Sequence, residues 1–389
     1  MHQLSLCITS SKIQLDPLKI ALLLLVSLSL CSCMSRPSVG ALELNDSFAK
    51  GAKQQDIMIV TTREKDERPN TYFNGERASG ASYAEASISV PPKHKLGAIE
   101  WPKELPGNPS TDFVARKANY IADKEQFKEK LNQRLSKLPK GKRQIFLFIH
   151  GYNIHFPEGL YRFAQIAHDT KTDAIPVFFS WASRGKAQDY IYDLNSAAIA
   201  RKALQDTLVM LAQSKAEEVT VLAHSMGTWL LMETVLQATE KERQLLSKKL
   251  KHVILAAPDI DIDLFRAQLS ELNFSHSSFT VIVSRDDRAL RISTALAGGK
   301  ERVGAYPNEK ELAKLGATVV DITELNALDG LHHTKFSQLE EFSPEFRKTL
   351  EQSDLISDST SKSPKGLGQN LRGFVGSTLR LPIDIITSF

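Results

Sequence analysis

Residues 219–227 read Val-Thr-Val-Leu-Ala-His-Ser-Met-Gly. The apolar, mostly β-branched start favours a strand, and a helix-patterned stretch follows from Thr228 to Gln237. Ser225 therefore lies at a strand-to-helix turn between small residues, the pattern of a nucleophile elbow, although Ala223 stands where glycine is usual. A tight turn requires small residues at 223 and 227 and lifts the serine hydroxyl above the sheet edge. The N-terminus of the following helix can then stabilise an oxyanion.

The rest of the chain alternates between β-like apolar runs and amphipathic helical stretches. The runs lack a polar face, which is typical of strands buried on both sides. This alternation predicts an α/β fold with a mostly parallel sheet and helices on both faces. We expect strands at 145–149, 175–181, 219–223, 252–257, 279–284 and 318–322, and helices at 161–170 and 189–214. Upstream, we expect two strands at the antiparallel edge of the sheet, 56–63 and 83–90, and a charged helix at 113–138.

A serine nucleophile needs a base and a carboxylate that orients the base. In the chain order Ser-acid-His, the carboxylate belongs on the turn after the predicted strand 279–284, where Asp286 and Asp287 stand. Asp259, which follows the strand 252–257, is a reserve candidate. Any of these aspartates could instead be a solvated loop charge.

The base belongs after the last strand of the sheet. His332 and His333 follow the predicted strand 318–322 in a loop, and either could accept the serine proton or be a surface histidine. Serine, aspartate and histidine thus occur in the serial order that this chemistry requires.

Donors for the oxyanion are expected on two loops. The strand 145–149 is followed by His150, Gly151 and Tyr152, and Gly151 permits a close backbone approach. We expect the N–H groups of Tyr152 and Met226 to hold the oxyanion together. His150 is expected to pack between loops in support of this site, without taking part in the reaction.

Several segments together resemble a bacterial α/β-hydrolase family catalogued as the domain of unknown function number nine hundred. The resemblance covers about residues 56–342 and rests on residues 60–63, 150–153, 179–185, 192–197, 223–227, 255–261, 284–290 and 302–304. It implies the α/β-hydrolase fold, aligns the acid with Asp287 and favours His333 over His332. Lys335 stands where the family usually has an aromatic residue. The resemblance implies no particular substrate.

The N-terminus has the features of a secreted lipoprotein. Residues 20–30 are apolar, are preceded by lysines and are too few to span a bilayer, which needs roughly 20 residues. The following Leu30-Cys31-Ser32-Cys33 resembles a lipobox with Cys33 as the lipidated residue. We therefore expect a membrane-anchored protein of the bacterial cell envelope. An ordinary signal peptide and release into the periplasm is the alternative.

These features divide the chain into four parts. We expect a signal peptide at 1–33, a linker at 34–55, the α/β-hydrolase domain at 56–350, and a linker with an apolar tail at 351–389. All three cysteines lie in the first part, so a disulfide, a cysteine nucleophile and a thiolate metal site are excluded from the mature chain. We expect no metal and no cofactor. The formal charge of +4 is spread without a basic stripe, which argues against nucleic acid as a partner.

The sequence thus predicts a serine hydrolase of carboxylic esters, lipase-like, that acts through an acyl-enzyme on a small-molecule or lipid ester. Two alternatives stay open. A catalytically silent lipoprotein could keep the fold as a binding module, and a peptidase or amidase could use the same triad, because fold alone does not name a substrate.

Overall fold

The computed structural model describes residues 36–272, 278–342 and 378–380. The chain divides into two compact units, Met1–Pro37 and Ser38–Phe389, and the second contains every helix and strand of the described residues. Its strands are β1 Lys53–Asp66, β2 Tyr72–Val90, β3 Val114–Ile121, β4 Gln144–Ile149, β5 Ile175–Ser180, β6 Glu218–His224, β7 Leu250–Ala256, β8 Ser278–Val283, β9 Thr318–Asp321 and β10 Thr378–Arg380. Its helices are α2 Lys124–Ser136, α3 Phe156–Asp169, α4 Tyr190–Ala212, α5 Met226–Gln237, α6 Glu240–Lys249, α7 Ile262–Glu271, α8 Arg288–Leu296 and α9 Glu309–Lys314, with short 3₁₀ turns η1 Ala187–Asp189, η2 Val303–Ala305 and η3 Lys335–Phe342.

The described strands form one sheet in the order β10-β9-β8-β7-β6-β4-β5-β1-β2-β3. Neighbours from β10 to β1 are parallel, whereas β2 is antiparallel to β1 and to β3. Parallel strands end at the same edge of a sheet, so the loops after β4, β5, β6, β7, β8 and β9 are brought to one edge. The strands that precede the predicted site residues, β4, β6, β8 and β9, all end at this edge.

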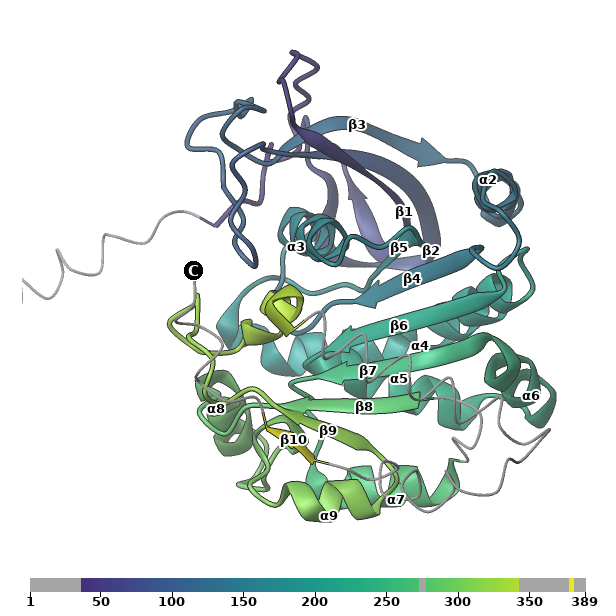
Figure 1. Ribbon diagram of the computed structural model, residues 1–389, viewed down its shortest axis with the longest axis vertical. Coiled ribbons are helices and arrows are strands. Elements are labelled where there is room, and N and C mark those ends of the chain that lie inside the picture. Colours follow the sequence, from purple (N-terminus) through teal and green to yellow (C-terminus); the bar gives the residue numbers. More distant parts are fainter. Residues whose placement is uncertain (1–35, 273–277, 343–377, 381–389) are drawn as a thin grey trace, which may run out of the picture. The chain divides into compact units, whose positions relative to one another are not determined.

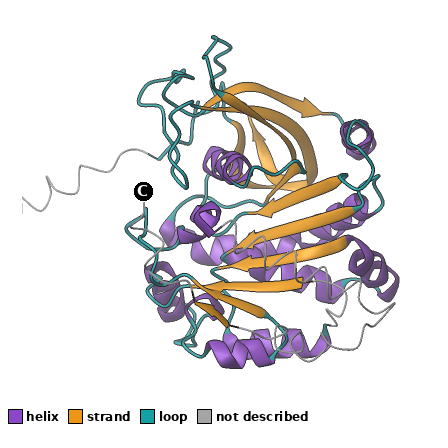
Figure 2. Ribbon diagram, in the orientation of Figure 1, coloured by secondary structure: helices purple, strands orange, loops and turns teal. Residues whose placement is uncertain are grey.

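Helices cover both faces of this sheet, as Figures 1 and 2 show. In β4, Ile145, Leu147 and Ile149 pack into the cluster that includes α2, α4 and α5, while Phe146 and Phe148 pack into the cluster that includes α3. Successive side chains point to opposite faces, which explains why the strand sequence is apolar throughout. The predicted architecture, a mostly parallel sheet with helices on both faces, is confirmed.

The antiparallel end of the sheet differs from the prediction. A single helix was expected at 113–138, but Val114–Ile121 is strand β3, and only Lys124–Ser136 is helical. The middle of this strand is partly or fully exposed and carries the adjacent charged residues Arg116 and Lys117, so the sequence resembles that of a surface helix. The helix begins after Asp123, whose side chain accepts a hydrogen bond from the Gln126 N–H. Because β3 occupies the edge, β1 and β2 lie inside the sheet, and β1 also pairs in parallel with β5.

Part of the predicted linker at 34–55 packs against the rest of the chain. Ala41 and Leu42 are buried, and the carbonyl of Ala41 accepts a hydrogen bond from the Tyr161 hydroxyl on α3. Asn45 donates from its backbone N–H to Ala115 O, and β1 begins at Lys53. At the other end, Thr378–Arg380 pairs in parallel with β9. The rest of the predicted tail lies outside the described residues.

Candidate active site

Ser225 joins β6 to α5 in a strained backbone conformation. Its φ of 52° and ψ of −124° lie outside the regions that residues other than glycine usually adopt. The Ser225 carbonyl accepts hydrogen bonds from the N–H and the hydroxyl of Thr228, which secure the turn. A Cβ atom on Gly227 would clash with the carbonyl oxygen of His150. The turn therefore needs a small residue at 227, as its sequence pattern indicates.

The loop after β4 approaches Ser225 from the neighbouring strand. A Cβ atom on Gly151 would lie 2.7 Å from Ser225 Cβ, so only glycine permits this approach. Tyr152 follows in the same loop, and Met226 is the first residue of α5. The two backbone segments predicted to donate to an oxyanion thus flank Ser225.

Asp287 and His333 meet at this edge although they are 46 residues apart. The Asp287 Oδ2 and His333 Nδ1 atoms are 2.7 Å apart. The other carboxylate oxygen of Asp287 accepts the Leu290 N–H at 2.9 Å and caps the N-terminus of α8. The carboxylate is only 1% exposed, so water does not compete for either bond. This arrangement fixes the orientation of the imidazole.

His333 packs against the residue that precedes Ser225. The rings of His224 and His333 have their centroids 4.6 Å apart, and His224 Nε2 lies 3.3 Å from the His333 carbonyl oxygen. His224 in turn stacks on Phe336. The described residues contain no hydrogen bond from the Ser225 hydroxyl to His333. Catalytic hydrogen bonds are often long without substrate and tighten when it binds.

The pKa of His333 is set by two opposing effects. Burial lowers it, but the negative charge of Asp287 and the hydrogen bond to that carboxylate outweigh burial, so the pKa is raised above the ordinary 6.5. Asp259 and Asp329 add to the increase through their charges. A raised pKa makes the imidazole a stronger base.

Asp286 and His332, the alternative pair, form their own contact. The Asp286 Oδ2 and His332 Nδ1 atoms are also 2.7 Å apart. Asp286 further accepts hydrogen bonds from the Ser284 hydroxyl and from the Lys335 ammonium. Burial raises the pKa of Asp286, but the bonds to Lys335, Ser284 and His332 outweigh burial and lower it to about 2. Asp286 is thus fully engaged beside the Asp287–His333 pair.

Asp259, the reserve acid, does not contact a histidine. Its carboxylate accepts hydrogen bonds from the hydroxyls of Ser293 at 2.5 Å and Tyr190 at 3.3 Å, and it lies 3.3 Å from Arg302 Nε. These partners link α8 to the start of α4. Asp259 therefore contributes charge near the site and holds elements together.

His150 is buried between the loops after β4 and β5. It stacks on Trp181, whose indole N–H donates to the His150 carbonyl at 2.8 Å. Burial and the nearby positive charge of Arg63 lower the pKa of His150 to about 3, so the ring is neutral. His150 thus packs and orients the loop that carries Gly151 and Tyr152.

Arg63 lies in one of the segments that carry the family resemblance, but the sequence analysis gave this residue no role. Its guanidinium is fully buried at the end of β1 and donates to Ser180 Oγ and to the carbonyls of Asn74, Ser183 and Ile154. Burial lowers the pKa of Arg63 to about 10, which leaves it charged at neutral pH. The signals in the sequence were the resemblance of residues 60–63 and an arginine as the last residue of the predicted strand 56–63.

Asp193 is a second buried group whose role the sequence did not reveal. Its carboxylate accepts hydrogen bonds from the Asn153 N–H, the Ser183 hydroxyl and the Arg184 N–H. It binds the loop after β4 to the loop after β5 and so restrains Tyr152. The Tyr152 hydroxyl adds a hydrogen bond to the Ala187 carbonyl.

Asp329 restrains the loop that carries His333. One carboxylate oxygen accepts the N–H groups of Leu331 and His333, and the other accepts the N–H and hydroxyl of Thr334. Burial raises the pKa of Asp329, but these bonds outweigh it and the pKa is lowered. The carboxylate therefore stays charged and keeps the loop in one conformation.

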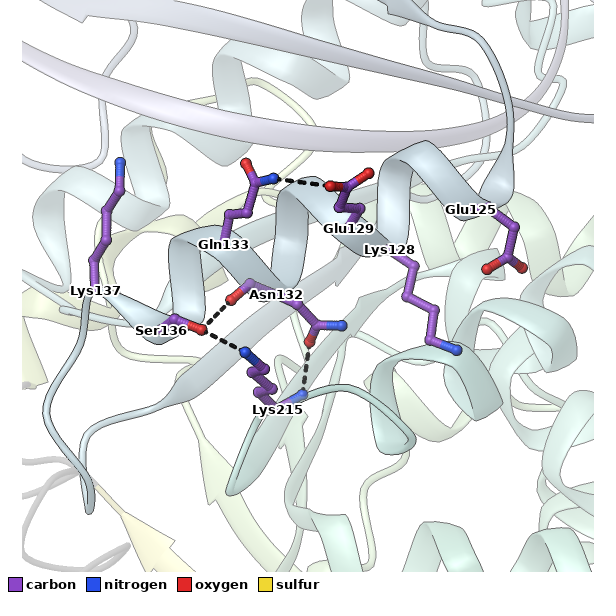
Figure 3. A pocket seen from close by; sticks show the side chains of 8 residues that line it. All are labelled: Glu125, Lys128, Glu129, Asn132, Gln133, Ser136, Lys137 and Lys215. Atoms are coloured by element: carbon purple, nitrogen blue, oxygen red, sulfur yellow. Dashed lines mark hydrogen bonds between the residues drawn. The ribbon is translucent and has the colours of Figure 1, made fainter.

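Other features lie away from this edge. An open hollow beside α2 is lined by polar side chains that bond to one another, such as Glu129 with Gln133 and Ser136 with Lys215 (Figure 3). None of the predicted site residues lines it.

Within the described residues no group of three or more His, Cys, Asp or Glu side chains could hold a metal ion. No helix of that part is long and apolar enough to cross a membrane. The predicted lipidation site, Cys33, lies outside the described residues.

Comparison with protein families finds a match to one family model. The sequence model of a family described as "Alpha/beta hydrolase of unknown function (DUF900)" matches residues 123–352. A comparison with curated proteins finds no match. Among solved structures, a mutant of esterase rPPE is 11% identical, with 86% of this chain and 78% of that chain covered and a TM-score of 0.27. An arylesterase is 12% identical, with 88% and 98% covered and a TM-score of 0.29. Both TM-scores are too low to support a statement about this chain.

Proposed function

The chain belongs to the α/β-hydrolase family DUF900, whose function is unknown, and from that premise we infer that it is a serine hydrolase of carboxylic esters. Ser225 is the nucleophile, His333 the base and Asp287 the residue that orients the base. The hydrogen bond between Asp287 and His333 carries this proposal, because it fixes a basic imidazole beside the elbow that presents Ser225.

The reaction proceeds in two halves. His333 Nε2 removes the Ser225 hydroxyl proton while Oγ attacks the acyl carbonyl, and Asp287 stabilises the imidazolium that forms. The N–H groups of Met226 and Tyr152 stabilise the negative charge on the tetrahedral oxygen, and each lowers the activation barrier by about 2.7–4 kcal/mol. The intermediate then expels the alcohol, which takes the proton from His333. An acyl group remains on Ser225.

Water completes the cycle. His333 removes a proton from a water molecule, which attacks the acyl carbonyl, and collapse of the second tetrahedral intermediate returns the proton to Ser225. The products are a carboxylic acid and an alcohol. The chain's own residues supply every proton transfer in this scheme.

Labelling with a fluorophosphonate probe tests the nucleophile. We expect the wild-type protein to be labelled and to hydrolyse a graded series of esters from acetyl to palmitoyl, and Ser225→Ala to lose both activities. Ser79→Ala, at an exposed serine of β2, is the matched control and should behave as the wild type. Equal labelling of the wild type and Ser225→Ala would exclude this serine. Labelling without hydrolysis of any ester would favour an amide substrate.

We also propose that the protein is a lipoprotein of the bacterial cell envelope, anchored through Cys33. The support is the apolar segment 20–30 followed by Leu30-Cys31-Ser32-Cys33. An anchor of this kind would hold the esterase close to lipid esters as well as to soluble ones.

A further inference from the structure

Two adjacent carboxylates face two adjacent imidazoles at this site. Asp286 contacts His332 and Asp287 contacts His333, each through a 2.7 Å distance to Nδ1. A shift of one residue in either loop would pair Asp286 with His333 or Asp287 with His332. Hydrogen bonds between the pairs alone do not prevent such an exchange, because both pairs are chemically identical. Asp287 is distinguished by its second bond, to the Leu290 N–H, and Asp286 by a feature of its own.

Lys335 is that feature. Its side chain is 1% exposed, and lysine is almost never buried unless it is paired. The ammonium donates to both carboxylate oxygens of Asp286, each at 2.8 Å, and to the Thr323 carbonyl at 2.7 Å. An ammonium has three N–H donors, and all three are used. Nothing in this arrangement leaves the ammonium free to move to another carboxylate.

These bonds join three segments of the chain. Asp286 lies on the turn between β8 and α8, Thr323 follows β9, and Lys335 lies two residues after His333. Asp286 also accepts a hydrogen bond from the Ser284 hydroxyl at 2.6 Å. The turn that carries the acid and the loop that carries the base are thereby held at one relative position. Asp286 thus binds Lys335 and Ser284 in addition to His332, whereas Asp287 binds the Leu290 N–H in addition to His333.

We propose that Lys335 is a positioning residue that secures Asp287 as the partner of His333. It acts through Asp286 and does not touch substrate, because its side chain is buried. The inference rests on the proposed esterase function.

The test compares Lys335→Met, Asp286→Asn and the double variant in the full-length protein. Positioning predicts that kcat for a soluble ester falls on the order of 10²-fold in each single variant while KM stays unchanged, since a displaced catalytic group costs about that factor. The double variant should lose no more than the more severe single variant, because both changes break one interaction. Fluorophosphonate titration counts active sites, so that unfolded protein does not lower the measured kcat.

Lys117→Met is the matched control. Lys117 pairs with the buried Glu85 on β2, away from the predicted site residues, and its loss should leave kcat unchanged. If Lys335→Met and Asp286→Asn both retain wild-type kcat per titrated site, Lys335 has no positioning role. Additive losses in the double variant would also contradict the proposal. A failure of the esterase assignment is recognised separately, because Ser225→Ala would then still be labelled.

Discussion

Asp287 uses its two carboxylate oxygens for two different contacts. One oxygen caps α8 and the other orients His333. A carboxylate at a helix N-terminus is stabilised by the helix dipole and by the N–H groups there. The same residue therefore fixes the start of a helix and the direction of an imidazole. Substitution at this position affects both the helix and the reaction.

The pH dependence of the reaction follows from His333. A protonated imidazole cannot accept the Ser225 proton, so kcat/KM should fall as the pH drops through the pKa of His333, which is raised above 6.5. In Asp287→Asn the acid limb should move to lower pH, because the charge that raises this pKa is lost. Turnover should also fall on the order of 10⁴-fold, because the imidazole is no longer held in the required tautomer.

The measurement is kcat/KM for a soluble ester across the pH range, in the wild type and in Asp287→Asn. Asp286→Asn is the comparison and should lower turnover far less, because Asp286 does not contact His333. The reverse order of the two variants would assign the acid to Asp286.

At the scale of elements, the loops around Ser225 are held by buried or half-buried charged groups that take no part in the proposed proton transfers. Arg63 and Asp193 restrain the loop after β4, and Asp329 restrains the loop that carries His333. Each charge is satisfied by several hydrogen bonds, which compensates for the cost of burial. The loops are thus rigid although they have no regular secondary structure.

His94 provides a similar support between a loop and α3. Its two ring nitrogens lie 2.7 Å from Glu100 and 2.9 Å from Asp169, and Asp169 also accepts the Gly97 N–H. The side-chain amide of Gln165 on α3 donates hydrogen bonds to Asp169 and to the Ser337 carbonyl in η3. Burial lowers the pKa of His94, but the hydrogen bonds to Asp169 and Glu100 outweigh burial, so the pKa is raised.

Replacement of His94 by Gln should therefore destabilise the protein in a pH-dependent way. A raised pKa in the folded state means that the charged histidine contributes stability below its ordinary pKa and loses that contribution as the pH rises through the folded pKa. We expect His94→Gln to cost about 3–5 kcal/mol at about pH 5.5, since the buried Asp169 and the half-buried Glu100 lose their partner, and less at about pH 9. Urea unfolding at both pH values measures the difference. Lys93→Gln, at an exposed residue of the same loop, is the control, and an equal loss at both pH values would contradict the assigned charge.

At the scale of the whole molecule, the site exists because the parallel strands of the sheet end at one edge. Ser225, Asp287 and His333 follow β6, β8 and β9, and the oxyanion loop follows β4. The order β9-β8-β7-β6-β4 places these ends along one edge of the sheet. Chemistry at that edge depends on the sheet as a unit.

The proposed anchor makes a prediction for the whole chain in its cell. Metabolic labelling with a clickable fatty acid should mark the wild-type protein, and Cys33→Ala should abolish the mark because the acceptor thiol is lost. Cys31→Ala, two residues earlier, should stay labelled. Loss of the mark in Cys31→Ala alone would move the lipidation site. An unlabelled wild-type protein would indicate an ordinary signal peptide.

The local elements of this fold could be predicted from the sequence, with particular exceptions. The elbow at Ser225 is visible because tight turns demand small residues within a few positions, and the apolar runs before and after it identify buried strands. Strand β3 was mistaken for a helix, because the charged residues of a half-exposed strand have the composition of a surface helix. The packing of residues 41 and 42 was missed because it depends on contacts with distant α3.

The sequence by itself determined the serial order of Ser225, Asp287 and His333, the small residues of the elbow and the mostly parallel α/β architecture, since these follow from local sterics and from the pattern of apolar residues. The tertiary structure decided which carboxylate meets which imidazole, a choice that the residues alone left open and the family resemblance favoured, and only the tertiary structure showed that Arg63, Asp193, Asp329 and Lys335 hold the surrounding loops. Most of those contacts join segments that are distant in the sequence, and their energy depends on burial that exists only once the sheet has formed.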